Sequence, residues 1–373
     1  MIDLSKIGGH ARSGPLRDLR VVELAGLGPG PFACMLLSDM GADVVTVDRP
    51  GARVGEPRNI VQRGRTVVHA DLKDPAAVRQ LLALLEGADV LVEGFRPGVM
   101  ERLGLGPDVV AARNPRLVYA RMTGWGQNGP LSQAAGHDIN YIAITGALHA
   151  IGTPARPVPP LNLLGDYGGG SLYLVVGILA AVHEARRSGQ GQMVDAAITD
   201  GVISLMAQFI GQSQRGAFIE QRESNMLDGG TPWYGAYEAA DGKHLSLGPI
   251  EPQFFARFCE LADVPPEWHS AHQDKARWPA LRAFLEGHFR ERTLAQWQRL
   301  LEGTDACFAP VLPLSEAMLH PHNMAREAFV RVDGVTHPAP APRFSRTPGA
   351  IQSPPSRSAS DLDEAIGRWI QDG

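Results

Sequence analysis

Short apolar runs alternate with helical patterns through the first third of the chain. Four runs rich in branched residues predict strands: Leu19–Leu24, Ala42–Pro50, Ala88–Gly94 and Arg116–Gly126. The intervening residues Phe32–Met40 and Ala76–Glu86 have the apolar spacing of helices. Strands that alternate with helices are typical of a doubly wound parallel sheet, which binds ligands at the carboxyl ends of its strands. The sequence therefore predicts a Rossmann-like large α/β domain.

The pattern changes in the second half of the chain and predicts a second domain. A long apolar helix follows Gly170, and another helical stretch comes after it. Aromatic residues and short strand-like pieces then predict a smaller α+β domain, with a turn at Ala240–Gly242. The predicted order is a large α/β domain (residues 1–200), a linker helix (201–224), the small domain (225–325) and a return segment that completes the large domain (326–373). Ser360 and Asp363 are the expected capping box of a last helix, Asp361–Ile370.

Composition and charge narrow the function classes. The chain has 373 residues, of which 44% are hydrophobic and 20% are charged, a balance typical of globular proteins and sufficient for two domains. The net charge of −5 gives no general attraction to nucleic acids or acidic membranes, so local Arg and Lys must hold any anionic ligand. Three widely separated cysteines without a C-x-x-C pattern exclude a disulfide framework and a cysteine zinc site.

No part of the sequence predicts export or membrane insertion. The first twenty residues lack the apolar run of a signal peptide. The most apolar stretch, Leu172–Val182, is shorter than the roughly 18 residues that a membrane-spanning helix needs. We therefore expect a cytoplasmic protein without a membrane span.

A glycine motif after the first strand suggests a dinucleotide site. Residues Gly28–Ala33 fit the pattern G-x-G-x-x-A, and Asp48 ends the next strand, where a ribose-binding acid would stand. A nicotinamide-dependent oxidoreductase is therefore one alternative. However, Pro29 and Pro31 occupy loop positions whose backbone N–H groups would face a pyrophosphate, and proline has no N–H. A tight strand-to-helix turn is the favoured interpretation.

Several longer motifs occur in order along nearly the whole chain, from about Leu16 to the segment PAPRFSRTP. They are VVELAGLGPGPFACMLLSDMGADVVTVDRP, EGFRPGVMERLGLGP, ARMTGWGQNGP, AGHDINY, LNLLGDYGGGSLYLVVGILAA, NMLDGG and GPIEPQF. This series resembles the family III CoA-transferase fold family, and specifically its α-methylacyl-CoA racemase branch. The resemblance implies a homodimer of two interlocked chains, an acyl-CoA substrate, and no separate cofactor because coenzyme A is part of the substrate.

The resemblance also implies the catalytic residues. The histidine of the motif G-H-D-I-N-Y is His137, the acid of the segment L-G-D-Y-G-G is Asp166, and the glutamate of I-E-P-Q-F, which supports the histidine, is Glu251. Inverting a carbon next to a thioester requires two acid/base groups that flank it, each with a pKa usable near neutrality. Histidine meets this requirement unperturbed, and a carboxylate does so when burial raises its pKa. Asp166 lies in an apolar, glycine-rich setting in which Gly168–Gly170 would leave room for a ligand.

Contacts with coenzyme A are implied by the same resemblance. They are Arg49, Arg63, Arg65, Ala70, Asp71, Leu72, Lys73, Gly94, Phe95, Arg96, Gly136, Asp138, Ile139, Asn140 and Tyr141. Arginine suits this ligand because its planar, permanently charged guanidinium binds phosphate groups. Backbone N–H groups around Asp138 are candidate donors to an enolate oxygen.

Each of these residues also has a structural interpretation. His137 could be a hydrogen-bonded structural histidine, and Asp166 could cap the helix that follows it. Glu251 could open a helix with Pro252 at its first position, and the arginines could be ordinary surface charges. His320 and His322 have a spacing found in metal sites, but no carboxylate or cysteine pattern accompanies them, so no metal is expected.

The predicted function is the interconversion of (R)- and (S)-2-methylacyl-CoA thioesters by proton transfer through an enolate. The first alternative is a family III CoA-transferase, in which Asp166 would attack the thioester carbonyl and form a mixed anhydride. His137 separates the two, because a transferase needs no second base and generally lacks histidine at this position. The nicotinamide oxidoreductase is the second alternative.

Overall fold

A computed structural model describes residues 12–371, and these form two compact units. The first contains residues 12–147, 160–206 and 322–371, and the second contains residues 148–159 and 207–321. The predicted linker of 201–224 is therefore divided between the units near residue 206, and a short hairpin segment from the middle of the predicted large domain joins the second unit.

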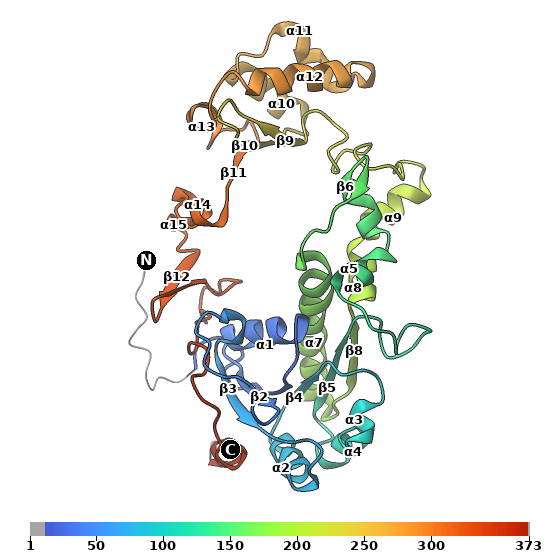
Figure 1. The fold of residues 1–373 in the computed structure, drawn as a ribbon, viewed down its shortest axis with the longest axis vertical. Coiled ribbons are helices and arrows are strands. Elements are labelled where there is room, and N and C mark those ends of the chain that lie inside the picture. The colour runs from blue at the N-terminus through green and yellow to red at the C-terminus, as the bar shows by residue number, and fades with distance from the viewer. Residues whose placement is uncertain (1–11, 372–373) are drawn as a thin grey trace. The chain divides into compact units, whose positions relative to one another are not determined.

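A six-stranded sheet is the centre of the first unit (Figure 1). Its strands are β1 (Arg20–Leu24), β2 (Asp43–Asp48), β3 (Arg65–His69), β4 (Val90–Glu93), β5 (Val118–Thr123) and β8 (Met193–Ala197). All neighbouring strands pair in parallel, in the order β3-β2-β1-β4-β5-β8. The direction of the chain across the sheet reverses between β1 and β4, the position at which open α/β sheets bind ligands. The predicted doubly wound parallel sheet is confirmed, with β3 and β8 as additional strands.

Helices cover both faces of this sheet. The α2 (Pro75–Glu86), α4 (Pro107–Arg113) and α16 (Leu362–Gln371) helices pack on one face, where Leu81, Val110 and Trp369 meet Val22, Val45 and Leu91. The α1 (Pro29–Asp39) and α7 (Leu172–Ser188) helices lie side by side (Figure 1), and α7 also contacts β5. The remaining elements of this unit are η1 (Ile60–Gln62), α3 (Val99–Arg102), α5 (Asp138–Ala143), η2 (Leu163–Ser171), α8 (Ile198–Leu205), β12 (Phe329–Val332) and β13 (Val335–Pro338).

The second unit has a separate core built on a three-stranded antiparallel sheet, β11-β10-β9. Aromatic side chains dominate this core, including Trp233, Phe255, Phe289 and Trp297. Its elements are β6 (Gly152–Thr153), β7 (Arg156–Pro157), α9 (Ala207–Gln214), β9 (Gly235–Glu238), β10 (His244–Leu247), α10 (Pro252–Leu261), α11 (Pro266–His269), η3 (Ser270–Gln273), η4 (Lys275–Arg277), α12 (Trp278–Phe289), α13 (Leu294–Leu301), β11 (Phe308–Val311) and α14 (Leu314–Ala317). Two short helices, α6 (Ala147–Ala150) and α15 (Pro321–Ala325), lie at the boundaries between the units.

The long apolar helix that the sequence predicts after Gly170 begins earlier in the structure, at Leu163. A π-helical segment, η2, continues directly into α7, so that Leu163–Ser188 forms one 26-residue helical stretch. By length and composition alone, this stretch is sufficient to cross a membrane. Its small residues instead pack against protein: a Cβ on Gly177 would lie 2.7 Å from the Val194 side chain. A core helix of this kind passes the same length test, so no membrane span is indicated.

The last helix is capped differently from the prediction. Asp361, not Ser360, accepts the backbone N–H of Asp363, at 2.9 Å. Ser360 instead forms a bridge with Val68 at the edge of β3, and its N–H donates to the Val67 carbonyl at 2.8 Å. The predicted capping box is therefore wrong, because pairing with the sheet holds Ser360 one residue before the cap.

Candidate active site

The largest cavity described lies in the first unit, at the carboxyl ends of β1, β4, β5 and β8. Its volume is about 650 Å³. His137 and Asp166 both line it, together with Asp138, Tyr141 and the loop Gly94–Pro97. The two residues expected to flank a reacting carbon are thus brought to one cavity from segments 29 residues apart in the chain.

His137 stands at the start of α5, with an exposed side chain at the mouth of the cavity. Its backbone is extended (φ −132°, ψ 173°), as the residue before a helix usually is. The Asn140 side chain accepts the His137 backbone N–H at 3.1 Å, and the Asn140 N–H donates to the His137 carbonyl at 2.8 Å. These bonds fix the His137 backbone at the start of α5, with its side chain on the cavity.

Asp166 is half-buried in η2, one of the π-helical insertions that often occur at functional sites. Its backbone N–H donates to the Asp138 carboxylate at 2.7 Å, and its carboxylate accepts a long bond from the Asn162 amide at 3.5 Å. Burial raises the pKa of Asp166, and the negative charge of Asp138 raises it further, although His137 and Asn162 act in the opposite direction. A carboxyl group with a raised pKa can hold a proton nearer to neutral pH than an ordinary aspartate does.

The glycine-rich turn after β1 packs against Asp166. Gly28 has φ 70°, and a Cβ placed there would lie 2.9 Å from Asp166 Oδ2. Ser171 Oγ donates to the Pro29 carbonyl at 2.7 Å, and the Tyr167 and Phe32 rings stack with centroids 4.2 Å apart. The turn therefore fits against the Asp166 segment of its own chain, which supports the structural interpretation of this glycine motif.

Two of the three glycines after Asp166 lie where neighbouring helices approach closely. A Cβ on Gly169 would lie 2.5 Å from the Val202 side chain, and a Cβ on Gly170 would lie 3.1 Å from both Ile198 and Pro29. On α8, a Cβ on Gly201 would lie 1.9 Å from the Gly169 carbonyl oxygen. Gly169, Gly170 and Gly201 therefore admit the neighbouring helices, while room for a ligand beside Gly168 stays a prediction.

Tyr141 and Trp125 form the wall of the cavity behind His137. Their rings meet edge to face, with centroids 4.8 Å apart, and the Tyr141 hydroxyl donates to the Gly136 carbonyl. Gly124 and Gly136 admit the Tyr141 ring, because a Cβ at either position would lie within 3 Å of it. Tyr141 was predicted as a ligand contact and Trp125 was not, although an aromatic residue in the sequence G-W-G after a strand was an available signal.

The predicted coenzyme A contacts fall into groups. Gly94, Phe95, Arg96, Gly136, Asp138 and Tyr141 line the cavity. Arg49 follows β2, and Ala70–Lys73 follow β3, so both lie at the same edge of the sheet. Ile139 and Asn140 lie in the first turn of α5 and do not line the cavity.

Arg63 and Arg65 do not reach the cavity. Both side chains are almost fully buried, at 1% and 0% exposure. Arg63 binds both carboxylate oxygens of Asp39, at 3.0 and 2.6 Å, and Arg65 pairs with Glu23 at 2.6 Å. The expectation that these guanidiniums face phosphates is corrected, because each is engaged with a buried carboxylate in the core.

Glu251 lies in the second unit, directly before α10, with Pro252 at the first helical position. Its side chain is exposed and makes no capping hydrogen bond. It therefore has the local position of the structural interpretation, while its support of His137 stays a prediction.

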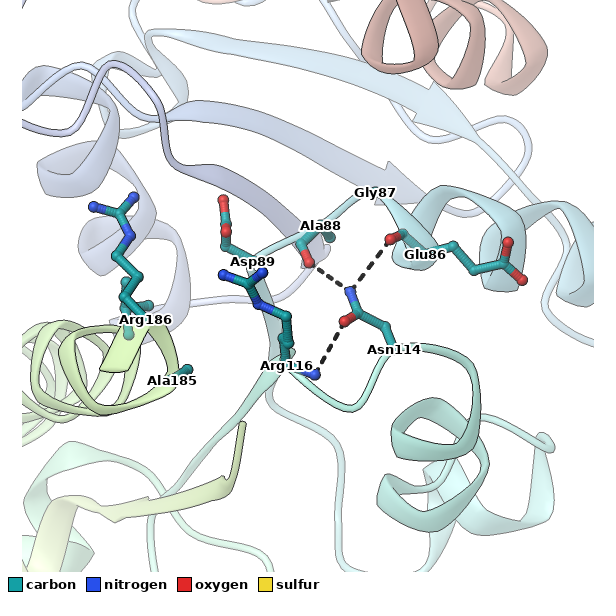
Figure 2. Close-up of a pocket in the computed structure, with 9 residues that line it drawn as sticks. Glu86, Gly87, Ala88, Asp89, Asn114, Arg116, Ala185 and Arg186 are labelled. Atoms are coloured by element: carbon teal, nitrogen blue, oxygen red, sulfur yellow. Dashed lines mark hydrogen bonds between the residues drawn. The ribbon is translucent and has the colours of Figure 1, made fainter. Parts of the chain in front are cut away.

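Two smaller cavities in the first unit contain none of the predicted catalytic residues. One of about 200 Å³ lies beside Asp48 and Arg53 at the carboxyl ends of β1 and β2, and it shares Leu27 with the large cavity. The other, of about 210 Å³, lies at the opposite, amino end of β4 and β5 (Figure 2). There the Asn114 amide donates to the Ala88 carbonyl at 2.8 Å and ties two loops together. Among residues 12–371, no cluster of three or more metal-ligating side chains occurs.

Comparisons with known proteins agree with this arrangement. Residues 16–359 match the model of the family described as CoA-transferase family III. The chain is 44% identical to the α-methylacyl-CoA racemase of Mus musculus and 41% identical to that of Homo sapiens, in each case over 89% of this chain and 87% of the relative. The crystal structure of Rv3272 from Mycobacterium tuberculosis superposes with a TM-score of 0.80 at 26% identity, covering 95% of this chain and 99% of that chain. The family match spans nearly all of the described residues, and the chain therefore belongs to CoA-transferase family III.

Proposed function

We propose that the protein is an α-methylacyl-CoA racemase, an isomerase that interconverts (R)- and (S)-2-methylacyl-CoA. The observation that carries the proposal is the placement of His137 and Asp166 on one cavity, with a raised pKa for the carboxyl group. A transferase needs the carboxylate alone, whereas inversion of a carbon needs two groups that exchange protons with it. The identity to two named racemases over most of the chain supports the same assignment.

The proposed reaction is a proton transfer across the α-carbon. In one direction, neutral His137 removes the α-proton, and the C–H electron pair moves toward the thioester carbonyl to give an enolate. Protonated Asp166 then donates its proton to the opposite face of the carbon, and the C–H bond that forms has the inverted configuration. The raised pKa of Asp166 favours this step, because the carboxyl group holds its proton at higher pH.

Two further groups would assist the removal of the α-proton by His137. The backbone N–H of Asp138, the first residue of α5, has no carbonyl of a preceding turn to bind, so it is suited to stabilise the enolate oxygen. Glu251 would accept the imidazole N–H and stabilise the cation that forms when His137 takes the proton. Coenzyme A would lie along the carboxyl edge of the sheet, from Gly94–Arg96 toward Ala70–Lys73 and Arg49.

Deuterium incorporation tests the mechanism. Wild-type protein in deuterated water should incorporate deuterium at the α-carbon of either enantiomer of a 2-methylacyl-CoA and equilibrate the two. His137→Ala and Asp166→Asn should each lose racemisation by about 10² to 10⁴-fold, the usual contribution of a general acid or base. Each variant should retain exchange in one enantiomer only, and the retained enantiomer should differ between them. Proton NMR with chiral analysis of the acid measures both quantities.

Control variants for His137→Ala and Asp166→Asn, and the result expected of a CoA-transferase, complete the deuterium test. His244→Ala and Asp108→Asn remove an exposed histidine and an exposed carboxylate away from the cavity and should exchange normally. A CoA-transferase would incorporate no α-deuterium, and Asp166→Asn would abolish its transfer activity while His137→Ala did little. Absence of deuterium in the wild-type product, or equal loss of both exchanges in both variants, would refute the two-base mechanism.

The proposed active enzyme is a homodimer. Leu163, Leu172, Val176, Ile203 and Leu205 are 44–64% exposed on η2, α7 and α8. These helices adjoin one another, since the Tyr173 hydroxyl donates to Ser204 Oγ at 2.7 Å. Apolar side chains gathered on one surface favour a protein partner. Val176→Glu should give a monomeric mass in light scattering, whereas Val109→Glu, an equally simple change at an exposed valine of α4, should not.

Mixing His137→Ala subunits with Glu251→Gln subunits tests whether Glu251 comes from the partner chain. If each site combines His137 of one chain with Glu251 of the other, His137→Ala and Glu251→Gln subunits together form one intact site in each heterodimer. Random pairing then places an intact pair in about a quarter of all sites, so the rate of racemisation should rise to roughly that fraction of the wild-type rate. If one chain supplied both residues, every site would carry a substitution and the mixture would stay at the level of its components.

A further inference from the structure

Two loops that follow neighbouring strands line the large cavity, and a buried arginine lies near the start of both. The first loop, Gly94–Gly98, follows β4, and the second, Gly124–Gly136, follows β5. Arg121 is the fourth residue of β5 and is 5% exposed. It does not line the cavity, so it can act on a ligand only through these loops.

The first loop is held through Glu93, the last residue of β4. The Glu93 carboxylate is 3% exposed, and its Oε2 accepts the backbone N–H of Phe95 at 2.7 Å. Its other oxygen, Oε1, lies 3.3 Å from Arg121 Nε. Arg121 thus forms a buried ion pair, without a hydrogen bond through Nε, with the carboxylate that binds the loop one residue before Arg96.

The second loop is held by the same guanidinium. Arg121 Nη1 donates to Gln127 Oε1 at 2.6 Å, and Nη2 donates to Glu101 Oε1 of α3 at 2.5 Å. The Gln127 backbone N–H donates to Asp195 of β8 at 2.9 Å, which ties this point of the loop to the sheet. The planar guanidinium therefore connects Gln127 of the second loop with Glu101 of α3 through hydrogen bonds, and it lies in ion-pair contact with Glu93 at the base of the first loop.

We propose that Arg121, together with Glu93, is a positioning residue that sets the separation of the Gly94–Gly98 and Gly124–Gly136 loops and thereby the affinity for the acyl-CoA thioester. The inference rests on the proposed function for the identity of the ligand. The network touches neither His137 nor Asp166, so its loss should weaken binding while chemistry at saturation is largely retained.

The ionisation of Glu93 makes this support dependent on pH. Burial raises the pKa of Glu93 to about 7. The Phe95 N–H and Arg121 favour the ionised form, while Glu101 of α3 and Asp195 of β8 favour the protonated form. Tyr119 of β5 also faces this carboxylate, and its own pKa is raised above the usual range. Glu93 therefore carries the charge that binds Phe95 and Arg121 above about pH 7 and loses it as the pH falls through that value.

Binding measurements on Arg121→Lys and Glu93→Gln test the inference. The ligand is isobutyryl-CoA, which is a 2-methylacyl-CoA without a stereocentre, and its Kd is measured by calorimetry. Arg121→Lys keeps the charge but cannot reach three partners, so Kd and KM should rise about tenfold, as for one lost charged hydrogen bond, with kcat changed less than about threefold. Asp39→Asn, which breaks the buried pair with Arg63 outside the cavity, should lower the melting temperature without raising Kd.

The pH dependence is measured with S-isobutyryl-pantetheine, which has no phosphate to titrate. For a group with a pKa of about 7, the ionised fraction falls about tenfold from pH 8 to pH 6. The wild-type Kd should rise by up to that factor, and Glu93→Gln should show little of this rise. Unchanged Kd values in both variants, or a pH profile of Glu93→Gln that matches the wild type, would overturn the inference. A wild type that binds isobutyryl-CoA but exchanges no α-deuterium would instead overturn the proposed racemase function alone.

Discussion

Replacing Gly28 by alanine tests how closely the turn after β1 positions Asp166. The added Cβ would lie 2.9 Å from Asp166 Oδ2, whereas an ordinary contact begins near 3.4 Å. The carboxylate must therefore retreat by about 0.5 Å. Since a misplacement of about 1 Å can cost about 100-fold in rate, half of that displacement predicts a loss of about tenfold in steps that use Asp166. The backbone at φ 70° and ψ −115° should also lower the free energy of unfolding by about 1–3 kcal/mol.

The assay is the initial rate of α-deuterium incorporation into each pure enantiomer, measured alongside thermal denaturation. Exchange of the enantiomer deprotonated by Asp166 should fall about tenfold, and exchange through His137 should fall less. Two other glycine variants separate the effect of displacing Asp166 from the effect of a strained backbone. Gly30→Ala places a methyl group in open space two residues away and should be active and at least as stable. Gly104→Ala also adds a side chain at a positive φ (72°), with no neighbour within 4 Å, and it should lose stability without losing exchange.

Two outcomes would refute this reasoning. If Gly28→Ala exchanges both enantiomers at the wild-type rate, the carboxylate is not held by the turn. If it loses both exchanges equally, and Gly104→Ala does the same, the effect is general destabilisation and says nothing about Asp166.

Three further predictions concern the ligand, the helix packing and the last helix. Arg96→Ala should raise KM for an acyl-CoA by roughly tenfold to a hundredfold, as expected for one charged hydrogen bond, but much less for the pantetheine thioester; an equal effect on both thioesters would exclude a phosphate contact. Gly201→Ala should lower the free energy of unfolding by at least about 2 kcal/mol and unfold at a clearly lower temperature, because its Cβ would lie 1.9 Å from the Gly169 carbonyl oxygen. Wild-type stability of this variant would contradict the packing of α8 against η2. Asp361→Ala should lose about 1 kcal/mol in chemical denaturation through loss of the cap, and Ser360→Ala should lose less; the reverse order would restore the capping-box prediction.

The sequence predicted four of the six strands, and the two that it missed share a physical cause. In β3 only Val67 and Val68 are apolar, and β8 has Asp195 at its centre and Val194 as its one branched residue, so neither has the density of branched apolar residues found in β4. The charge at Arg65 is compatible with a buried strand only because Glu23 of β1 accepts it across the sheet. A pairing between residues 42 positions apart is set by the tertiary structure, and no local pattern contains it.

The same limit applies to the candidate site. The motifs identified His137 and Asp166 as candidates, and the structure brings both to one cavity. The family resemblance implied that Arg63 contacts coenzyme A, but its burial against Asp39 depends on the packing of α1, which the motif does not contain. The support of His137 by Glu251 stays a prediction. It depends on how residues of separate units come together, whereas the motif shows only that a glutamate is present.

The close approach of Gly28 to Asp166 has a consequence for redesign. In dinucleotide enzymes, the corresponding glycine turn leaves space that an external anion fills. In this protein the Asp166 side chain of the same chain occupies that space. The turn therefore has a permanent partner and no room for an external anion. Replacing Pro29 and Pro31 to restore backbone donors would not create a nicotinamide enzyme, since a phosphate would have to displace a like-charged group held by η2. Any new specificity would have to begin by removing Asp166, and with it the chemistry proposed for this fold.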